Sequence, residues 1–304
     1  MKQQGVALIT ALLIVALVVI VATSLLEKQQ LMIQRTAHHL QQEQAYLYAL
    51  GAENWATKVL MRDRQQNKVD HLSEMWAKQL PPAFISGGQL NGKLSDEQSK
   101  FNINNLLDIE NKPSPENIQR FEKLLKKLEL PVNFVMQALD WIDEDSNVQM
   151  GGAEDNEYGL QNPPYRTANK RFQNVEELRL LLGMKEADFK VLLPHITALP
   201  TITPINLNTT TPEILMSMVE NLPETSAATL LEKALRGIYK TVEDFLKESA
   251  LNNLKVDMKG LSVSSDYFRL ETTVMIGESV MRLESLLQRD EKQCRVLMRN
   301  LRGE

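Results

Sequence analysis

The feature that most constrains this chain is an uninterrupted apolar run close to its N-terminus. Residues 6–26 carry no formal charge, and their hydroxyl groups belong to Thr10, Thr23 and Ser24 alone. A helix that crosses a bilayer needs about 20 predominantly apolar residues. We therefore expect residues 6–26 to form one membrane-spanning helix.

The helical pattern continues beyond the apolar run. From Leu26 to Leu50 apolar residues recur at intervals of three, four or seven, interleaved with Gln, Glu and His, as on one face of an amphipathic helix. No Gly or Pro occurs between Val6 and Leu50. The sequence therefore predicts one long helix, with a transmembrane half over 6–26 and an amphipathic half over 27–65.

The five residues before this helix form a short leader, Met1-Lys2-Gln3-Gln4-Gly5. A secretory signal would instead place its small-residue cleavage site after the apolar segment. This beginning resembles the N-terminus of type IV prepilin-like proteins. The resemblance implies that a prepilin peptidase cuts after Gly5 and that Val6, N-methylated, becomes the first mature residue. An ordinary uncleaved signal anchor is the alternative interpretation.

Position 10 departs from the pattern of that superfamily. Its members usually carry glutamate as the fifth mature residue, and this chain has Thr10. The glutamate is thought to neutralise the N-terminal amine of a neighbouring subunit within the lipid, where an unpaired charge costs ~2.5–3.5 kcal/mol. A subunit without it suits the end of a fibre. With the length of the chain, this resembles the K minor pseudopilins of type II secretion, which are large tip subunits.

Composition bounds the possible functions. The net charge of −5 argues against a general nucleic-acid binder, which would be basic. A single cysteine, Cys294, excludes an internal disulfide. Lys2 lies on the short side of the apolar run, so the positive-inside rule places the rest of the chain outside the cytoplasm. We expect a single-pass protein of the inner membrane with its bulk in the periplasm.

Two groups of short strands are predicted, one on each side of a long helical stretch. The first group comprises residues 83–86, 89–94 and 101–103, and the second comprises residues 267–276, 280–287 and 294–298, where apolar residues alternate with a period of two. The first group is too small to be stable alone. We therefore expect both groups, in segments 66–105 and 263–304, to join in one antiparallel sheet.

Between the two strand groups the pattern is helical. The predicted helices span residues 115–130, 134–142, 176–182, 187–193, 212–219, 227–235 and 242–251. The predicted fold class is α+β: a long N-terminal helix packed on a small antiparallel, pilin-like sheet, with a large all-α domain, residues 106–262, inserted in the sheet. The resemblance to the K pseudopilins implies the same organisation.

One segment of the predicted insert is strongly acidic. Between Lys127 and Arg166 there are eight carboxylates and no Lys or Arg. Such a density is self-repelling, and Ca²⁺, which takes six to eight oxygen ligands, would relieve it. Asp143, Asp145 and Asn147 have the spacing of the first ligands of an EF-hand loop, but a valine stands where that loop needs glycine. A true EF-hand is therefore excluded.

The calcium hypothesis rests on chain reversal and on the family resemblance. Gly151 and Gly152 would let the chain fold back toward the helix before them. The resemblance to the K pseudopilins implies a calcium-binding segment here. The predicted ligands are Asp140, Asp143, Asp145, Asn147, Glu154, Asp155 and Asn156. A solvated acidic loop is the alternative interpretation.

Residues 204–215 resemble the first half of a helix-hairpin-helix module. The position of its glycine-rich hairpin is occupied by Leu-Pro-Glu-Thr-Ser at 222–226, which argues against phosphate binding and favours a structural helical repeat. The four histidines show no zinc-ligand spacing, and no nucleophile motif or phosphate loop is present.

The leading functional hypothesis is therefore non-enzymatic. The resemblance implies a minor pseudopilin that caps the tip of the type II secretion pseudopilus and nucleates its assembly with two other minor pseudopilins, of the I and J types, for protein export across the outer membrane. Two alternatives from other classes are a membrane-anchored helix-hairpin-helix DNA-binding protein of the competence type and an anchored hydrolase that uses the carboxylate cluster.

Overall fold

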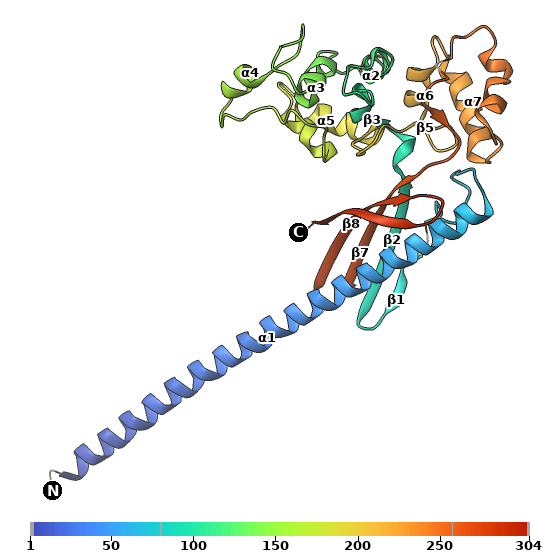
Figure 1. Ribbon diagram of the computed structural model, residues 1–304. Helices are drawn as coiled ribbons and strands as arrows, with labels where there is room; N and C mark the ends of the chain where they lie inside the picture. The colour runs from blue at the N-terminus through green and yellow to red at the C-terminus, as the bar shows by residue number, and fades with distance from the viewer. Residues whose placement is uncertain (1–2, 80, 257, 303–304) are drawn as a thin grey trace.

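The computed structural model describes residues 3–79, 81–256 and 258–302. Its first element is α1 (Gln3–Gln66), a single helix that projects far beyond the rest of the molecule (Figure 1). Within the described ranges it is the one helix long and apolar enough to cross a membrane, and no residue of its most apolar stretch is buried. The predicted continuous helix is thereby confirmed.

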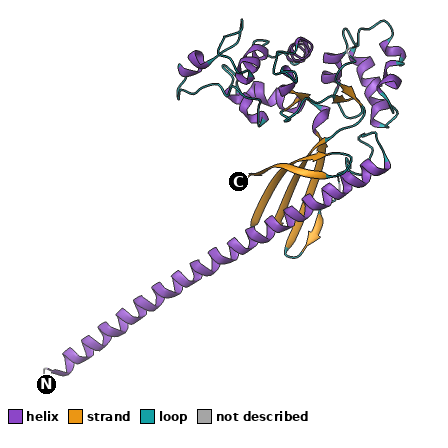
Figure 2. Cartoon of the chain, viewed as in Figure 1, coloured by secondary structure: helices purple, strands orange, loops and turns teal. Residues whose placement is uncertain are grey.

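The C-terminal third of α1 lies across a sheet (Figure 2). Ala45, Ala49 and Ala56 are fully buried at this contact. Their spacing of four and seven places them on one face of the helix, and their small side chains let the helix backbone approach the strands closely. Leu60 extends the same face into a cluster with Trp76 and four buried residues of β2, β7 and β8.

The sheet contains strands from both predicted groups. Its order is β1 (Ala83–Ile85), β2 (Gly88–Asp96), β7 (Tyr267–Ile276), β8 (Ser279–Arg289) and β9 (Cys294–Arg302). All neighbours are antiparallel, and β2 pairs with β7 from Gly88↔Ile276 to Asp96↔Phe268. The two groups thus form one five-stranded sheet, as the small size of the first group predicted.

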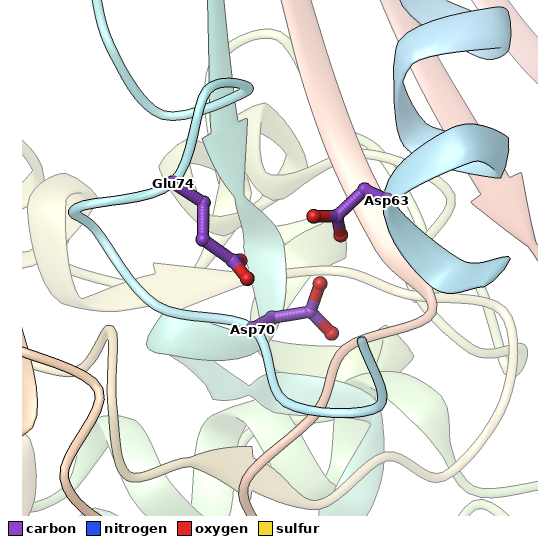
Figure 3. A group of neighbouring side chains, drawn as sticks. All are labelled: Asp63, Asp70 and Glu74. Atoms are coloured by element: carbon purple, nitrogen blue, oxygen red, sulfur yellow. The ribbon is translucent and has the colours of Figure 1, made fainter. Parts of the chain in front are cut away.

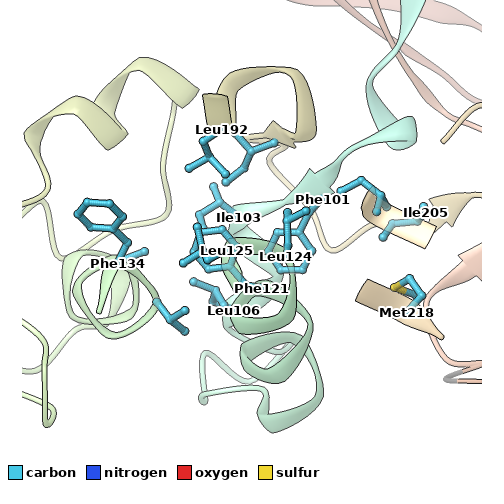
Figure 4. Packing of buried hydrophobic residues seen from close by; sticks show 14 of the residues in the cluster. Phe101, Ile103, Leu106, Phe121, Leu124, Leu125, Phe134, Leu192, Ile205 and Met218 are labelled. Carbon is cyan, nitrogen blue, oxygen red and sulfur yellow. The ribbon is translucent and has the colours of Figure 1, made fainter. Parts of the chain in front are cut away.

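Between β2 and β7 the chain leaves the sheet and forms the upper part of the molecule in Figure 1. We call residues 97–266 the head. Its α-helices are α2 (Pro115–Lys127), α3 (Phe134–Ile142), α4 (Asp155–Gly159), α5 (Glu186–Leu192), α6 (Pro212–Met218), α7 (Glu224–Leu235) and α8 (Val242–Leu246), with 3-10 turns between them. They pack on one apolar cluster, in which Phe101 and Phe121 stack with ring centroids 5.3 Å apart (Figure 4).

The expected all-α character of the inserted segment is not confirmed. The head contains two short parallel pairs: β3 (Phe101–Asn102) with β4 (Ile196–Thr197), and β5 (Ile205–Asn206) with β6 (Leu261–Ser262). Strands of two residues are too short to produce a detectable alternation.

The prediction that residues 101–103 belong to the large sheet is wrong. Phe101 is buried in the apolar cluster of the head, and the chain continues as a 3-10 turn, Ile103–Leu106. Two predicted helices also differ from the structure. Residues 175–180 form a 3-10 helix, and the helix predicted over 242–251 ends at Leu246. Tertiary packing has overridden the local pattern in each case.

Candidate functional site

The acidic segment lies at the outer end of the head, around the end of α3 and the start of α4 (Figure 1). Asp140 occupies the last turn of α3 and is fully buried. Its Oδ2 accepts a hydrogen bond from the backbone N–H of Gln149 at 3.1 Å. A Cβ at Gly152 would lie 1.9 Å from the same oxygen. A side chain at position 152 would have to displace the Asp140 carboxylate, and the chain folds back here as the glycine pair predicted.

Three of the predicted ligands are buried and incompletely paired. Asp140, Asp143 and Glu154 have 0%, 7% and 2% of their surface exposed. Asp140 Oδ1, Asp143 Oδ1 and Glu154 Oε1 are each buried without a hydrogen-bond partner. A buried carboxylate oxygen without a partner is strongly destabilising when ionised. Each of these three carboxyl groups therefore needs either a bound proton or a neighbouring cation to be stable at its buried position.

The pKa values at this site move in the direction that such burial requires. Burial, with the neighbouring charge of Asp145, raises the pKa of Asp140 to about 6 against the opposing hydrogen bond from Gln149. Burial and the charges of Asp145, Asp140 and Glu154 raise the pKa of Asp143 to about 7. Burial likewise raises the pKa of Glu154. Without a cation Asp143 and Asp140 therefore take up protons as the pH falls through about 7 and 6, respectively, well above the usual range of a carboxyl group.

The other four predicted ligands lie in different surroundings. Asp145, Asn147 and Asn156 are exposed, and Asp145 Oδ1 accepts the backbone N–H of Asn147 at 2.7 Å. Asp155 Oδ1 accepts the backbone N–H of Thr167 at 3.0 Å and its hydroxyl at 2.9 Å. The seven predicted ligands thus divide into three buried carboxylates and four residues that are exposed or already hydrogen-bonded.

A further segment, residues 167–169, reaches the site and was missed by the sequence reasoning. The Thr167 hydroxyl also donates to Glu154 Oε2 at 3.2 Å, and the backbone N–H of Asn169 donates to Trp141 O at 3.1 Å. Asn169 Oδ1 is buried without a hydrogen-bond partner. No spacing in the sequence signals this residue, because only the folded chain brings it to the end of α3.

The donor set fits calcium in its chemistry. Carboxylate and amide oxygens are the ligands that this hard cation prefers. Within the part of the chain that the structure describes, however, the predicted ligands do not bring three carboxylate oxygens within 4.8 Å of one another. Calcium would therefore draw these side chains closer together.

A different trio meets that distance criterion: Asp63, Asp70 and Glu74, at the end of α1 and in the loop after it (Figure 3). Their cation is Arg289, whose Nη2 donates to both Asp70 oxygens at 2.6 Å while Nη1 donates to Asp63 Oδ2 at 3.0 Å. Glu74 accepts hydrogen bonds from Asn67 Nδ2, the His71 N–H and Trp76 Nε1. This trio is therefore a structural ion-pair network.

The network continues into the head through the segment that resembles half of a helix-hairpin-helix. Asp96 Oδ2 accepts hydrogen bonds from Asn206 Nδ2 at 3.1 Å, Thr209 Oγ1 at 2.6 Å and Ser265 Oγ at 2.6 Å. Thr211, the N-cap residue of α6, makes no side-chain cap hydrogen bond. Asn206 and Thr209 are buried at the junction of head and sheet, where they cannot contact a phosphate.

The predicted processing residues lie at the far end of α1. Gly5 and Val6 belong to its first turns. The Thr10 hydroxyl donates to the carbonyl oxygens of Val6, at 3.1 Å, and Ala7, at 3.0 Å. The side chain of Thr10 is therefore uncharged and satisfied by its own helix.

Comparison with known proteins gives consistent matches. Residues 99–201 and residues 205–264 match two family descriptions of type II secretion system (T2SS), protein K. Type II secretion system protein K of Pseudomonas aeruginosa is 38% identical over 98% of this chain and 93% of that protein. The Klebsiella pneumoniae protein of the same name is 33% identical over 98% of this chain and 96% of its own.

A solved structure is similar over most of the chain. A chain from the crystal structure of the GspK-GspI-GspJ complex of enterotoxigenic Escherichia coli superposes with a TM-score of 0.75 at 25% identity. The match covers 89% of this chain and all of the other. The similarity therefore extends across the sheet and the head.

Proposed function

Since the chain belongs to the type II secretion system protein K family and is a minor pseudopilin, we propose that it caps the tip of the pseudopilus and nucleates its assembly. Its proposed partners are two other minor pseudopilins, of the I and J types. The similar solved chain was crystallised in a complex of GspK, GspI and GspJ, which supports this choice. The role is non-enzymatic.

The position of the head carries the proposal. The head lies beyond the sheet, at the end of the molecule opposite to the N-terminus of α1 (Figure 1). In a fibre built by packing helices such as α1 side by side, the head would occupy the space that a subunit stacked above would need. This supports a place at the end of the fibre.

The residue at position 10, Thr10, also supports a position at the end of the fibre. A subunit within the fibre would need a carboxylate near this depth to pair with the amine of the next subunit, since unpaired charges in lipid are costly. The Thr10 hydroxyl instead donates to its own helix. A tip subunit has no neighbour above it and needs no such carboxylate.

The proposed route to the fibre begins at the inner membrane, with α1 as the single membrane anchor and the sheet and head in the periplasm. A prepilin peptidase then cuts between Gly5 and Val6, and Val6 is methylated. Sequencing the N-terminus of the mature protein tests this route. Val6 as the first residue agrees with it, whereas an intact Met1 contradicts it.

We also propose that the acidic segment binds Ca²⁺ through Asp140, Asp143 and Glu154. Their unpartnered, buried oxygens support this assignment, because the ion would supply the positive charge that these three carboxylates do not receive from an ion pair within the described residues. A bound ion would fix the long connection between α3 and α4 to the end of α3. Its role would be structural.

Immunogold labelling of the head on sheared pseudopili tests the tip assignment. Gold particles at one end of each fibre are expected. A labelled major pseudopilin serves as the control, because it should be decorated along the whole length. Gold along the length for this chain would contradict a tip position.

A further inference from the structure

We propose that the groove between the head and the C-terminal strand β9 binds an extended acidic segment of another protein. The segment would add to the open edge of β9, pair a carboxylate with Arg295 and place an apolar side chain in the groove. This inference rests neither on the tip position nor on calcium binding.

The groove lies where the head meets the outer strands of the sheet. Its volume is about 730 Å³, within the range of protein sites that enclose a ligand. The head contributes Phe172 and Pro200 to its lining, and the sheet contributes Leu286 of β8 with Leu297 and Met298 of β9. Both sides of the groove therefore offer apolar surface to a side chain.

One side of the groove is an open strand edge. β9 ends the five-stranded sheet, so within the described residues it pairs with β8 on one side and with no strand on the other. An extended chain can add to such an edge through backbone hydrogen bonds. The register with β8 shifts between Leu286 and Leu287, which makes Leu297 the extra residue of a bulge. Its side chain lines the groove and is 41% exposed.

The groove carries positive charge, although the chain as a whole has a net charge of −5. Arg171 and Arg295 line it, and among the described lining residues there is no Asp or Glu. Arg171 donates to the carbonyl oxygens of Asn104 and Asp108, which are neutral acceptors. Neither arginine has a carboxylate oxygen within 4.0 Å in the described part of the chain. A guanidinium in this state favours a carboxylate ligand.

A row of hydrogen bonds holds Arg295 in place. Its Nε donates to Gln288 Oε1 at 3.2 Å, and Gln288 Nε2 donates to the Tyr267 hydroxyl at 3.1 Å. That hydroxyl lies 2.8 Å from Thr201 Oγ1 of the head. The row therefore crosses from β9 over β8 and β7 to the head. Because Arg295 is positioned in advance, a ligand loses less side-chain entropy on binding.

Other occupants fit the groove less well. A second copy of β9 would meet like charges, because residues 292–302 contain no Asp or Glu and four cations, Lys292, Arg295, Arg299 and Arg302. A free phosphate would pair with the arginines but leave the apolar lining uncovered. An acidic segment that alternates charged and apolar side chains satisfies both parts, since alternate residues of a strand face the same way.

Fluorescence anisotropy with two labelled synthetic peptides, titrated with the full chain in detergent micelles, tests the proposal. One peptide alternates valine with glutamate, and the other alternates valine with lysine. Arg295→Met removes the charge and keeps an apolar stem. Lys292→Met is the matched control, because it removes one charge from an exposed residue outside the groove, three positions earlier in the chain.

We expect the unmodified protein to prefer the acidic peptide. Arg295→Met should weaken that binding by about tenfold, the loss that follows removal of a hydrogen bond to a charged group. Leu297→Ala should weaken it by about fivefold through lost apolar contact. Lys292→Met should bind like the unmodified protein, and so should Leu301→Ala, which changes an exposed leucine of β9 outside the groove. Backbone amides of residues 294–302 should exchange more slowly in the bound state.

Several results would overturn the proposal. No binding, or equal binding of the two peptides, would leave Arg295 as a charge that keeps the edge strand from pairing. Equal losses in Arg295→Met and Lys292→Met would show nonspecific attraction only. Binding without slower exchange over 294–302 would exclude addition to β9. A dimer in sedimentation that the acidic peptide does not dissociate would place a second copy of the chain on this edge instead.

Discussion

The Arg289 guanidinium lies 2.6 Å from both carboxylate oxygens of Asp70, and each residue is only 1% exposed. Arg289 ends β8, and Asp70 belongs to the segment after α1. Arg289 Nη2, the atom that contacts both oxygens, also donates to Ser265 O at 2.7 Å. The pair therefore ties together three parts of the chain where the sheet meets the head.

Replacing Arg289 should strongly destabilise the protein. Arg289→Met would leave the Asp70 carboxylate buried without its cation, and breaking a buried ion pair from one side costs about 3–5 kcal/mol. The measurement is the free energy of unfolding of the full chain in detergent. Arg295→Met is the control, because Arg295 is exposed on β9 and should matter by about 0.5 kcal/mol or less. A loss below about 1 kcal/mol for Arg289→Met would contradict the assigned role.

Calcium should stabilise the head through its buried carboxylates. At a calcium concentration of about 100 times Kd, binding to the folded state adds about 2.7 kcal/mol of stability. Glu154→Gln should abolish most of the calcium-dependent rise in Tm. Glu144→Gln, which changes an exposed acid in the same segment, should keep it. Equal responses from the two variants would point to nonspecific binding by an acidic loop.

The calcium-free protein should become more stable as the pH falls from 8 to 5. In the folded state Asp140 has a pKa of about 6 and Asp143 a pKa of about 7. The unfolded chain takes up these protons only near pH 4. The folded state therefore binds more protons between about pH 4 and 7, and stability rises as the pH falls through that window.

Thermal unfolding in the presence of chelator measures this effect. Other buried carboxyls with raised pKa values, including Asp63 and Asp96, contribute with the same sign, so a variant is needed to isolate the acidic site. Asp143→Asn should reduce the gain by about 1–2 kcal/mol, a figure discounted for solvent screening. A profile identical to that of the unmodified protein would show that Asp143 is not protonated in the fold.

Thr10→Glu should weaken assembly with the I- and J-type partners. In a tip subunit the introduced carboxylate would find no N-terminal amine of a subunit above it to pair with. An unpaired charge inside the membrane costs ~2.5–3.5 kcal/mol. Co-purification of the three proteins from membranes measures the effect. Thr10→Ser keeps a hydroxyl and should assemble normally. Undiminished recovery of the complex with Thr10→Glu would argue against the proposed role of this position.

The elements that sequence reasoning predicted well are those with a long local pattern. The continuous helix follows from the apolar run and from the absence of Gly and Pro up to Leu50. The strand β7 follows from ten alternating residues, of which Phe268, Leu270 and Val274 are buried as expected. Burial of one face of a strand imposes a period of two on the apolar residues, and a period that continues over ten residues can be detected in the sequence.

The features that were missed depend on contacts between distant residues. The pairs β3–β4 and β5–β6 are two residues long and have no period. The Asp70–Arg289 pair joins residues 219 positions apart, and no local sequence pattern near either residue indicates this contact. In the acidic segment, composition indicated an excess of carboxylates but could not show that Asp145 is exposed while Asp143 is buried.

The return of the chain to the sheet also bears on how the protein folds. Glu97, at the exit from β2, bonds to Arg269 of β7, 172 residues later in the chain. During synthesis β2 therefore emerges long before β7, its later partner strand, and the long connection between these two strands closes late. Contacts this distant slow folding, and the open edge of β2 is exposed to mispairing meanwhile. The sheet that supports α1 can thus be completed only after the C-terminal strands have been synthesised.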